Sequence, residues 1–403
     1  MLRKIGKIIV GILIVIGLLA GVIFLFAPKP PKTPENVADV AELEEYLNEL
    51  VESETPPGLS VTVVKDGEHV YSNAFGYADL PNGIEATPET VYHWWSMTKV
   101  ATAVSILQLA EQGKLNLDDP VVDHLPFFEV EYPSADSPVV TIRHLLSHTS
   151  GLPDMIPDLF GLVHSEDMTM DQTAILKEYL PSFNKLKFEP GSDAAYTNLS
   201  YLVLGSVIEA VSGQRYESYI QENVLQPLAM DDTDFIYRDE MVVHEAIGSH
   251  PFVSIFTPML PLLLDMDALV RERIGTQYWL ERVYIDVTPS TGLIGSTPDV
   301  AKLMQGLLSD DSQLLSAASI AAMQPKGDQP SERPLGWAEF GEENGHSDKL
   351  STKRSWVQHS GGGPGFATVM RLYPEEGLGV VIMANNTNLD NDGLAELVAN
   401  MDW

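Results

Sequence analysis

The 403-residue chain contains no cysteine, which excludes disulfide bonds, a thiolate nucleophile and cysteine-ligated zinc. Basic residues are also scarce. The 24 lysines and arginines stand against 57 aspartates and glutamates, which gives a formal net charge of −33. Five of these bases fall in residues 1–33, which hold no acid, so the remainder is more acidic still. Because so acidic a body repels nucleic acid, no nucleic-acid partner is expected.

Two familiar kinds of catalytic motif are absent as well. No Gly-x-Ser-x-Gly pentapeptide occurs, which argues against the nucleophile elbow of an α/β-hydrolase. His144 and His148 stand four residues apart and could share a helix face, but no third metal ligand is apparent. We therefore expect no metal and no other cofactor.

The N-terminus carries the clearest targeting signal. Residues 8–27 contain no charge and, as a helix, are long enough to span about 30 Å of hydrocarbon. The basic residues of segment 1–7 predict a cytoplasmic tip, and the proline-rich residues 28–36 predict a stiff linker. Residues 37–403 would then form one domain outside the cytoplasmic membrane, on its periplasmic or extracellular face. The alternative is a signal peptide cleaved after Ala27, which would give a secreted protein.

Hydrophobic periodicity places strand patterns at both ends of the chain. Residues 59–64 alternate like a strand and can pair with 69–75, and residues 366–373 can pair with 378–384 across a turn. The intervening chain is mostly helical. Such an order predicts one sheet completed by both chain ends, with the middle helices as a second lobe and a cleft between them. Helical patterns cover residues 37–51, 141–148, 169–181, 199–211, 216–224, 300–308 and 394–401.

Ser96 and Lys99 stand at the start of a further run, which is apolar nearly all round and continues to Ala110. Such a run predicts a helix buried in a core. A hydroxyl and an amine three residues apart share one helix face, and burial lowers the pKa of a lysine from about 10.4. The neutral amine can accept the serine proton and so create a nucleophile. The alternative is a serine that only begins the helix, with a lysine in its first turn.

Two other segments carry polar groups suited to the same chemistry. Tyr196 and Asn198 lie in a loop just before an expected helix, and His359 begins a glycine-rich entry to a strand. Each residue alone has an ordinary structural explanation, such as a half-buried aromatic side chain or a helix N-cap. The catalytic interpretation depends on the three segments occurring together.

The three segments resemble the Ser-x-x-Lys, Tyr-x-Asn and Lys/His-x-Gly motifs of the serine β-lactamase and penicillin-binding-protein superfamily, in the same order. Residues 145–152 and 292–299 also resemble the branch that contains class C β-lactamases, D-aminopeptidases, DD-peptidases and family VIII carboxylesterases. The resemblance covers roughly residues 40–400. It implies an α/β fold of the α+β, β-lactamase/transpeptidase-like type. An antiparallel sheet built from both chain ends would be flanked by helices and joined to a mostly helical lobe.

The resemblance also implies roles for individual residues. Ser96 would attack a carbonyl and become acylated, while Lys99 and Tyr196 would carry protons. Tyr196 would act as a tyrosinate or share a proton with Lys99, because a cation stabilises a phenolate. The implied substrate-binding residues are Asn198, His359, Ser360 and Gly361, and the implied oxyanion hole consists of the backbone N–H groups of Ser96 and Gly362.

His359 departs from the classical β-lactamases, which carry lysine at this position. Because histidine is largely neutral at pH 7, a permanent cation for a substrate carboxylate is missing. We therefore expect a membrane-anchored serine hydrolase for a small-molecule ester, a small D-amino-acid peptide or amide, or a cell-wall-derived substrate. The alternatives are a penicillin- or peptidoglycan-binding module with little turnover and a true β-lactamase. The oligomeric state stays open.

Residues 251–264 form a strongly apolar segment that is too short and too proline-rich to span a bilayer. One alternative is core packing. The other is a flap over the cleft that offers an apolar wall to an acyl chain or touches the membrane. The flap hypothesis predicts that part of the segment is exposed to solvent near Ser96.

Overall fold

The computed structural model describes residue 21 and residues 31–403, except 157, 166–170, 255–256, 258–259, 310, 328 and 345–352. The expected basic tip (1–7), the anchor (8–27) apart from Gly21, and residues 28–30 of the linker lie outside the described residues. Within the described part, no helix is both long enough and apolar enough to cross a membrane.

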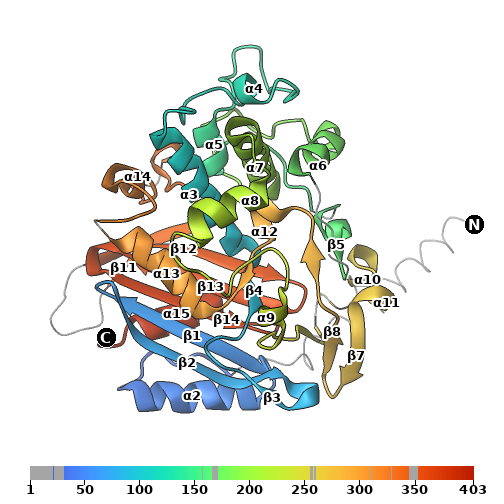
Figure 1. Ribbon diagram of the computed structural model, residues 1–403, viewed down its shortest axis with the longest axis vertical. Coiled ribbons are helices and arrows are strands. Elements are labelled where there is room, and N and C mark those ends of the chain that lie inside the picture. Colours follow the sequence, from blue (N-terminus) through green and yellow to red (C-terminus); the bar gives the residue numbers. More distant parts are fainter. Residues whose placement is uncertain are drawn as a thin grey trace, which may run out of the picture.

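A seven-stranded antiparallel sheet unites the two ends of the chain (Figure 1). Its strand order is β11-β12-β13-β14-β1-β2-β3, and β1 and β14 pair from Leu59 with Ala384 to Lys65 with Leu378. The expectation of one antiparallel sheet built from both ends is therefore confirmed. The strands are β1 (Gly58–Lys65), β2 (Glu68–Asp79), β3 (Ile84–Glu85), β11 (Glu339–Asn344), β12 (Lys353–Gly363), β13 (Phe366–Tyr373) and β14 (Leu378–Ala384).

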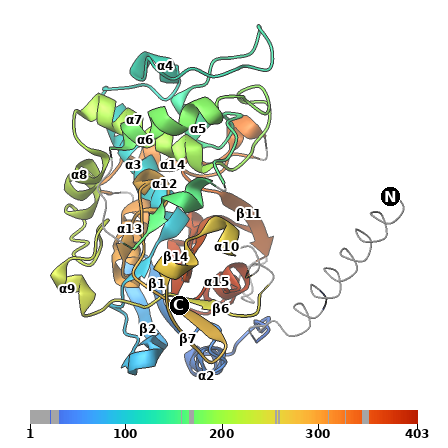
Figure 2. The same ribbon diagram turned by 90° about the vertical axis from the view of Figure 1, so that its right-hand side faces the viewer.

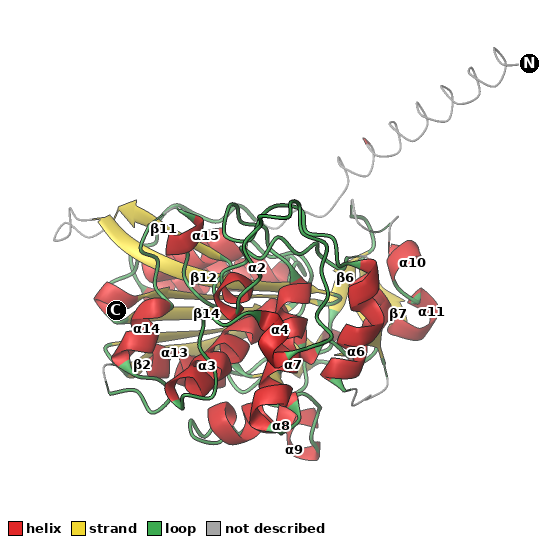
Figure 3. Cartoon of the chain, turned by 90° about the horizontal axis from the view of Figure 1, so that it is seen from above, coloured by secondary structure: helices red, strands yellow, loops and turns green. Residues whose placement is uncertain are grey.

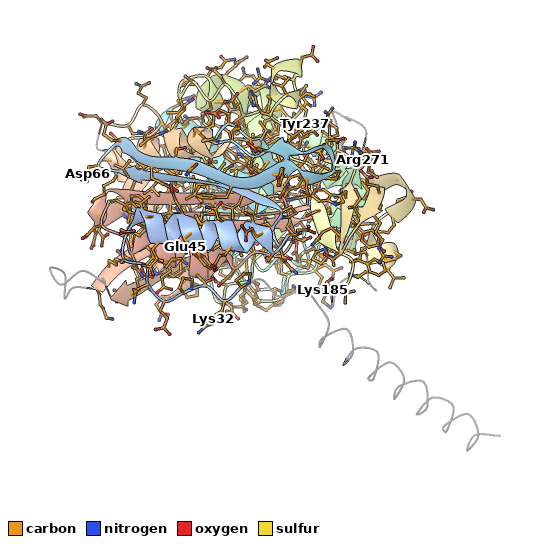
Figure 4. The ribbon with its side chains drawn as sticks, turned by 90° about the horizontal axis from the view of Figure 1, so that it is seen from below. Lys32, Glu45, Asp66, Lys185, Tyr237 and Arg271 are labelled. Atoms are coloured by element: carbon orange, nitrogen blue, oxygen red, sulfur yellow. The ribbon has the colours of Figure 1, made fainter. Side chains whose placement is uncertain are left out.

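Both faces of the central strands are covered by helices. In β14, Val380 and Ile382 pack in one apolar cluster with α2 (Val40–Glu52) and α15 (Asn391–Ala399), while Val381 packs in a second cluster with α13 (Thr297–Leu308). Alternate residues of a strand point to opposite faces, so a strand covered on both faces is apolar throughout. Figure 2 shows α13 and α15 on opposite sides of the sheet. Figure 4 shows α2 lying along the sheet with Glu45 on its outer surface.

The middle of the chain forms the expected helical lobe, which covers the sheet when seen from above (Figure 3). Its two central helices, α3 (Thr98–Glu111) and α7 (Asn198–Ser212), are buried over most of their length. Gly205 of α7 lets α12 (Thr288–Thr291) approach closely, because a Cβ atom there would lie 2.2 Å from Pro289. The contact brings the backbone of α12 toward Lys99. The remaining helices are α4 (Val121–His124), α5 (Ile142–Leu146), α6 (Gln172–Tyr179), α8 (Tyr216–Ile220), α9 (Asp239–Val242), α10 (Leu260–Leu263), α11 (Met266–Leu269) and α14 (Ala317–Ala322).

Short strands join the lobe to the sheet region. β6 (Ser249–Pro251), β8 (Gln277–Leu280) and β7 (Val270–Ile274) form a three-stranded sheet. Two-residue pairs connect distant parts of the chain, and sequence periodicity cannot register so short a strand. These pairs are β4 (Tyr92–His93) with β10 (Ile294–Gly295) and β5 (Val163–His164) with β9 (Tyr284–Ile285).

The apolar segment 251–264 is partly exposed, as the flap hypothesis requires. Leu262 of α10 exposes 83% of its surface, and Leu260 and Leu264 line an apolar pocket together with Pro364, the residue after β12. Residues 255–256 and 258–259 lie outside the described residues. The exposure is confirmed, whereas a position of the segment near Ser96 stays a prediction.

Candidate active site

The serine lies in a tight 3₁₀ turn, η2 (Trp95–Met97), and not in the first turn of α3 as the periodicity predicts. Trp95 has a φ of +47°, a left-handed conformation that costs a bulky residue roughly 1–2 kcal/mol. Packing holds it there, since its ring stacks on His93 at a centroid distance of 4.9 Å. The turn presents Ser96 at the junction of the sheet and the helical lobe.

Lys99 is fully buried, and its amine meets three polar atoms. Nζ lies 2.8 Å from Asn198 Oδ1, 2.9 Å from the carbonyl oxygen of Ser290 and 3.2 Å from Ser96 Oγ. Burial lowers the pKa of Lys99 well below its ordinary value, and the charge of Asp154 only partly opposes this shift. A neutral amine has two N–H groups, and the two oxygens that can only accept hydrogen bonds use both of them. In the neutral form, the lone pair therefore faces the hydroxyl of Ser96.

Asp154 is a residue of the candidate site that the sequence analysis missed. Its carboxylate accepts hydrogen bonds from the backbone N–H of Asn198 at 3.0 Å and from the side-chain Nδ2 at 3.3 Å. Because Nδ2 is held in this way, Oδ1 of Asn198 is turned toward Lys99. Asp154 and Asn198 are 44 positions apart, so their contact leaves no local pattern in the sequence. The only sequence signal for Asp154 was its position two residues after the segment 145–152.

Tyr196 exposes 39% of its surface but packs closely against the other predicted residues. Its ring lies 4.9 Å from Lys99 Nζ and 4.5 Å and 6.0 Å from the ring centres of His148 and His359. Although part of the side chain is exposed, burial around its hydroxyl group raises the pKa of Tyr196 above its ordinary value, and a hydrogen bond with Ser96 opposes the rise. The direction is opposite to that of the expected tyrosinate. Lys99 lies over the ring face, and desolvation is the largest cause of the shift.

His359 is 1% exposed and neutral. Burial is the largest cause that lowers its pKa to about 3, and a protonated Lys99 would oppose a positive charge on His359 as well. Nδ1 lies 2.9 Å from the carbonyl oxygen of Ser360, so Nδ1 carries the proton and donates it. Nε2 is then an acceptor, and it has no hydrogen-bond partner among the described residues. His359 therefore presents a lone pair and no positive charge.

The glycines of β12 lie on a strand edge that no neighbouring described strand covers. β11 pairs with β12 only as far as Gln358, whereas β13 continues to pair with it to Gly363. The outer edge of residues 359–363 is therefore free to hydrogen-bond to a substrate. Ser360 and Gly361, the other expected substrate-binding residues, belong to this edge.

Gly361 and Gly363 pack closely against η2, the turn that carries Ser96. A Cβ atom on Gly361 would lie 2.1 Å from the carbonyl oxygen of Trp94, and one on Gly363 would lie 2.4 Å from the Trp95 ring. A Cβ atom on Gly362 would meet nothing within 4 Å. β12 therefore reaches the turn of Ser96 while Gly362 faces open space. The oxyanion hole formed by the backbone N–H groups of Ser96 and Gly362 stays a prediction.

Alanine substitutions at Gly361 and Gly362 form a matched pair. We expect Gly361→Ala to lower the free energy of unfolding by about 2–3 kcal/mol, because its methyl group collides with a backbone carbonyl that cannot move aside. Gly362→Ala should stay within about 0.5 kcal/mol of the parent. Urea denaturation measures both values. Equal stabilities of the two variants would contradict the close approach of β12 to η2.

Comparisons with known proteins identify the family of the chain. A model of the Beta-lactamase family matches residues 43–400. The chain is 28% identical over 348 residues to Protein flp of Staphylococcus aureus strain MW2, a match that covers 86% of this chain and 62% of flp. It is 28% identical over 335 residues to penicillin-binding protein 4* of Bacillus subtilis strain 168, covering 81% of this chain and 67% of that protein. The chain thus spans about three fifths of the length of flp.

Solved structures share the fold over most of the chain. The octameric penicillin-binding protein homologue from Pyrococcus abyssi superposes with a TM-score of 0.69 at 26% identity, covering 90% of this chain and 76% of that one. The D-amino acid amidase from Ochrobactrum anthropi SV3 superposes with a TM-score of 0.68 at 19% identity. The match covers 87% of this chain and 96% of the amidase, and it shows the fold alone. With a family model matched from residue 43 to residue 400, the chain belongs to the beta-lactamase family.

Proposed function

We propose that the protein is a serine hydrolase that forms an acyl-enzyme on Ser96. The observation that carries the proposal is the hydrogen bonding of Lys99, whose two fixed acceptors, Asn198 Oδ1 and the Ser290 carbonyl oxygen, leave its lone pair directed at Ser96 Oγ. Membership of the beta-lactamase family supports the same assignment.

The acylation step follows from these positions. Lys99 takes the hydroxyl proton as Ser96 Oγ bonds to the substrate carbonyl carbon, and the carbonyl oxygen becomes an oxyanion held by backbone N–H groups. When the bond to the leaving alcohol or amine breaks, that group takes a proton from Lys99 directly or through the Tyr196 hydroxyl. Water then attacks the acyl carbon, gives a proton back to the serine oxygen through Lys99, and releases the acid.

The substrate we propose is a carboxylic ester or a small D-amino-acid amide or peptide. His359 carries the argument, because its buried Nε2 offers a lone pair where a substrate carboxylate would need a donor or a cation. Two lone pairs facing each other repel, whereas a neutral amide N–H or hydroxyl group pairs well with Nε2. A D-amino acid amidase shares the fold, which is consistent with such a substrate.

Three substrates tested side by side distinguish this function from its alternatives. We expect sustained hydrolysis of p-nitrophenyl butyrate or of a D-amino acid amide. The kcat/KM for nitrocefin should be about 100-fold or more lower, because its carboxylate meets no cation. A burst of one equivalent without further turnover would instead identify a penicillin-binding module. Preferred turnover of nitrocefin would identify a β-lactamase.

We further propose that residues 8–27 anchor the domain outside the cytoplasmic membrane. The 20 uncharged residues and the bases before them support this location. Expressed in bacteria, the full chain should remain in the membrane fraction after extraction at alkaline pH, and protease added outside the membrane should digest its catalytic domain. Recovery of a shortened chain in the culture medium would identify a cleaved signal peptide.

A further inference from the structure

A pocket separate from Ser96 lies between α5, α14 and the segment that leads from α14 to β11. Its volume is about 100 Å³, and its walls include Arg143 and His144 of α5, Gly191 of the loop before α7, and Lys326 and Arg333. In Figure 1, α5 and α14 lie on either side of the outer end of α3. Nothing in the proposed acyl transfer uses this pocket.

The guanidinium group of Arg333 lies 5.0 Å from the centre of the Phe340 ring and has no carboxylate partner among the described residues. It is half-buried and, alone among the half-buried or buried arginines that the structure describes, it has no carboxylate oxygen within 4.0 Å. Nε and Nη2 of Arg333 donate to the carbonyl oxygens of Ser147 and Ala338, each at 3.2 Å. The other N–H groups of the guanidinium have no hydrogen-bond partner among the described residues. Burial without a counter-ion also lowers the pKa of Arg333.

The remaining polar groups of the pocket favour an anion. Lys326 is exposed at its rim and has no ion pair with a described residue. His144 already has backbone partners, since Nδ1 accepts the N–H of Thr141 at 3.2 Å and the ring also hydrogen-bonds to the backbone of Val139. The one acid in the wall, Glu332, accepts a backbone N–H from Gln329 but keeps its negative charge, and Arg143 is already paired with Asp118. The cations without a counter-ion, Lys326 and Arg333, therefore outnumber the one acid of the pocket in a chain whose formal net charge is −33.

We propose that this pocket binds a small oxyanion, a phosphate or a carboxylate, on the free N–H groups of Arg333 with Lys326 at the entrance. Guanidinium groups bind both anions through paired hydrogen bonds. The bound anion would also brace the loop that leads to Tyr196, because Gly191 donates its N–H to Thr149 at 2.8 Å and both residues line the pocket.

Thermal unfolding of the full chain at pH 7.5 tests the proposal. Inorganic phosphate and acetate are titrated separately against sodium chloride of the same ionic strength. We expect one or both oxyanions to raise the Tm of the parent by a few degrees beyond the chloride control. A larger response to phosphate identifies a phosphate site, and a larger response to acetate identifies a carboxylate site. A Tm that follows ionic strength alone would overturn the proposal.

Three variants assign the response to the pocket. Arg333→Gln should weaken the apparent affinity at least tenfold, whereas Arg271→Gln, an exposed arginine on β7 labelled in Figure 4, should leave it unchanged. Lys326→Gln removes an exposed charge without disturbing the core and should weaken the affinity several-fold. Lys326→Gln provides the test of the pocket if Arg333→Gln does not fold. The assignment is overturned if both Lys326→Gln and Arg333→Gln respond to the oxyanions like the parent. It is also overturned if Lys326→Gln responds like the parent and Arg333→Gln does not fold.

Discussion

Replacement of Ser96 by alanine is expected to abolish covalent labelling by a fluorophosphonate probe and to lower ester hydrolysis by about 10⁵-fold or more. The reason is the position of Ser96 Oγ beside buried Lys99, whose N–H groups are bound by Asn198 and the Ser290 carbonyl oxygen. No other hydroxyl among the described residues has such a position. Labelling is read by gel fluorescence and hydrolysis by the release of p-nitrophenol. Ser96→Ala should unfold at the same urea concentration as the parent, because it removes only one hydroxyl.

Ser147 provides the matched control, because it precedes His148 and so offers a rival serine–histidine pair in the sequence. Its hydroxyl bonds instead to the carbonyl oxygen of Arg143 at 2.9 Å and to Thr149 Oγ1 at 2.9 Å. The His148 Nδ1 is occupied by the N–H of Thr197. Ser147→Ala should therefore be labelled like the parent and lose only about 1 kcal/mol of stability. If Ser96→Ala is still labelled and Ser147→Ala is not, the nucleophile is Ser147, and the assignment to Ser96 is wrong.

The parts of the fold that the sequence predicts well are those with strong local signals. Residues 366–373 and 378–384 are predicted and observed over the same ranges, since apolar residues run on both sides of a turn with Gly377 in the left-handed conformation. α13 likewise contains the expected helix 300–308, and it begins at Thr297 with Pro298 in its first turn, where proline is well tolerated. These features depend on neighbours within a few residues, so they can be read without knowledge of the tertiary structure.

The start of the helix after Ser96 shows where local reading fails. Periodicity predicts a helix from Ser96, but a 3₁₀ turn precedes α3 and Trp95 adopts a positive φ. No residue preference favours that conformation for tryptophan. Contacts with His93 and Gly363 impose it, and the second of these residues lies more than 260 positions away. The exact presentation of the nucleophile is therefore a tertiary property.

The clustering of the expected site residues was predictable, but the protonation states of these residues were not. The motifs bring Lys99, Tyr196, Asn198 and His359 into one cluster with Ser96, as the resemblance implies. Whether the tyrosine or the lysine is the base depends on how far each is desolvated, and burial moves both pKa values against the charged form. Asp154 escaped notice for a related reason, since its effect on Lys99 requires its position in space.

Lys99→Met is expected to slow acylation by about 10³-fold, within the range that general-base catalysis contributes. Methionine has a similar length and is apolar, so the core keeps its volume while the proton acceptor is lost. Stopped-flow measurement of the first turnover with a p-nitrophenyl ester isolates the acylation step. A variant that acylates at the parent rate would make Lys99 a structural residue only, and Tyr196 would then have to act as the base.

The pH dependence of acylation distinguishes these two bases. If neutral Lys99 is the base, acylation rises with pH as its proton is lost, and the acid limb lies well below the ordinary lysine pKa of about 10.4. His359 is already neutral above pH 4, since its pKa is about 3, and it contributes no limb near neutrality. Asp154 raises the pKa of Lys99, so Asp154→Asn should move the acid limb to lower pH. A base with the raised pKa of Tyr196 would instead give a rate that still climbs above pH 10, and Lys99→Met would leave that profile in place.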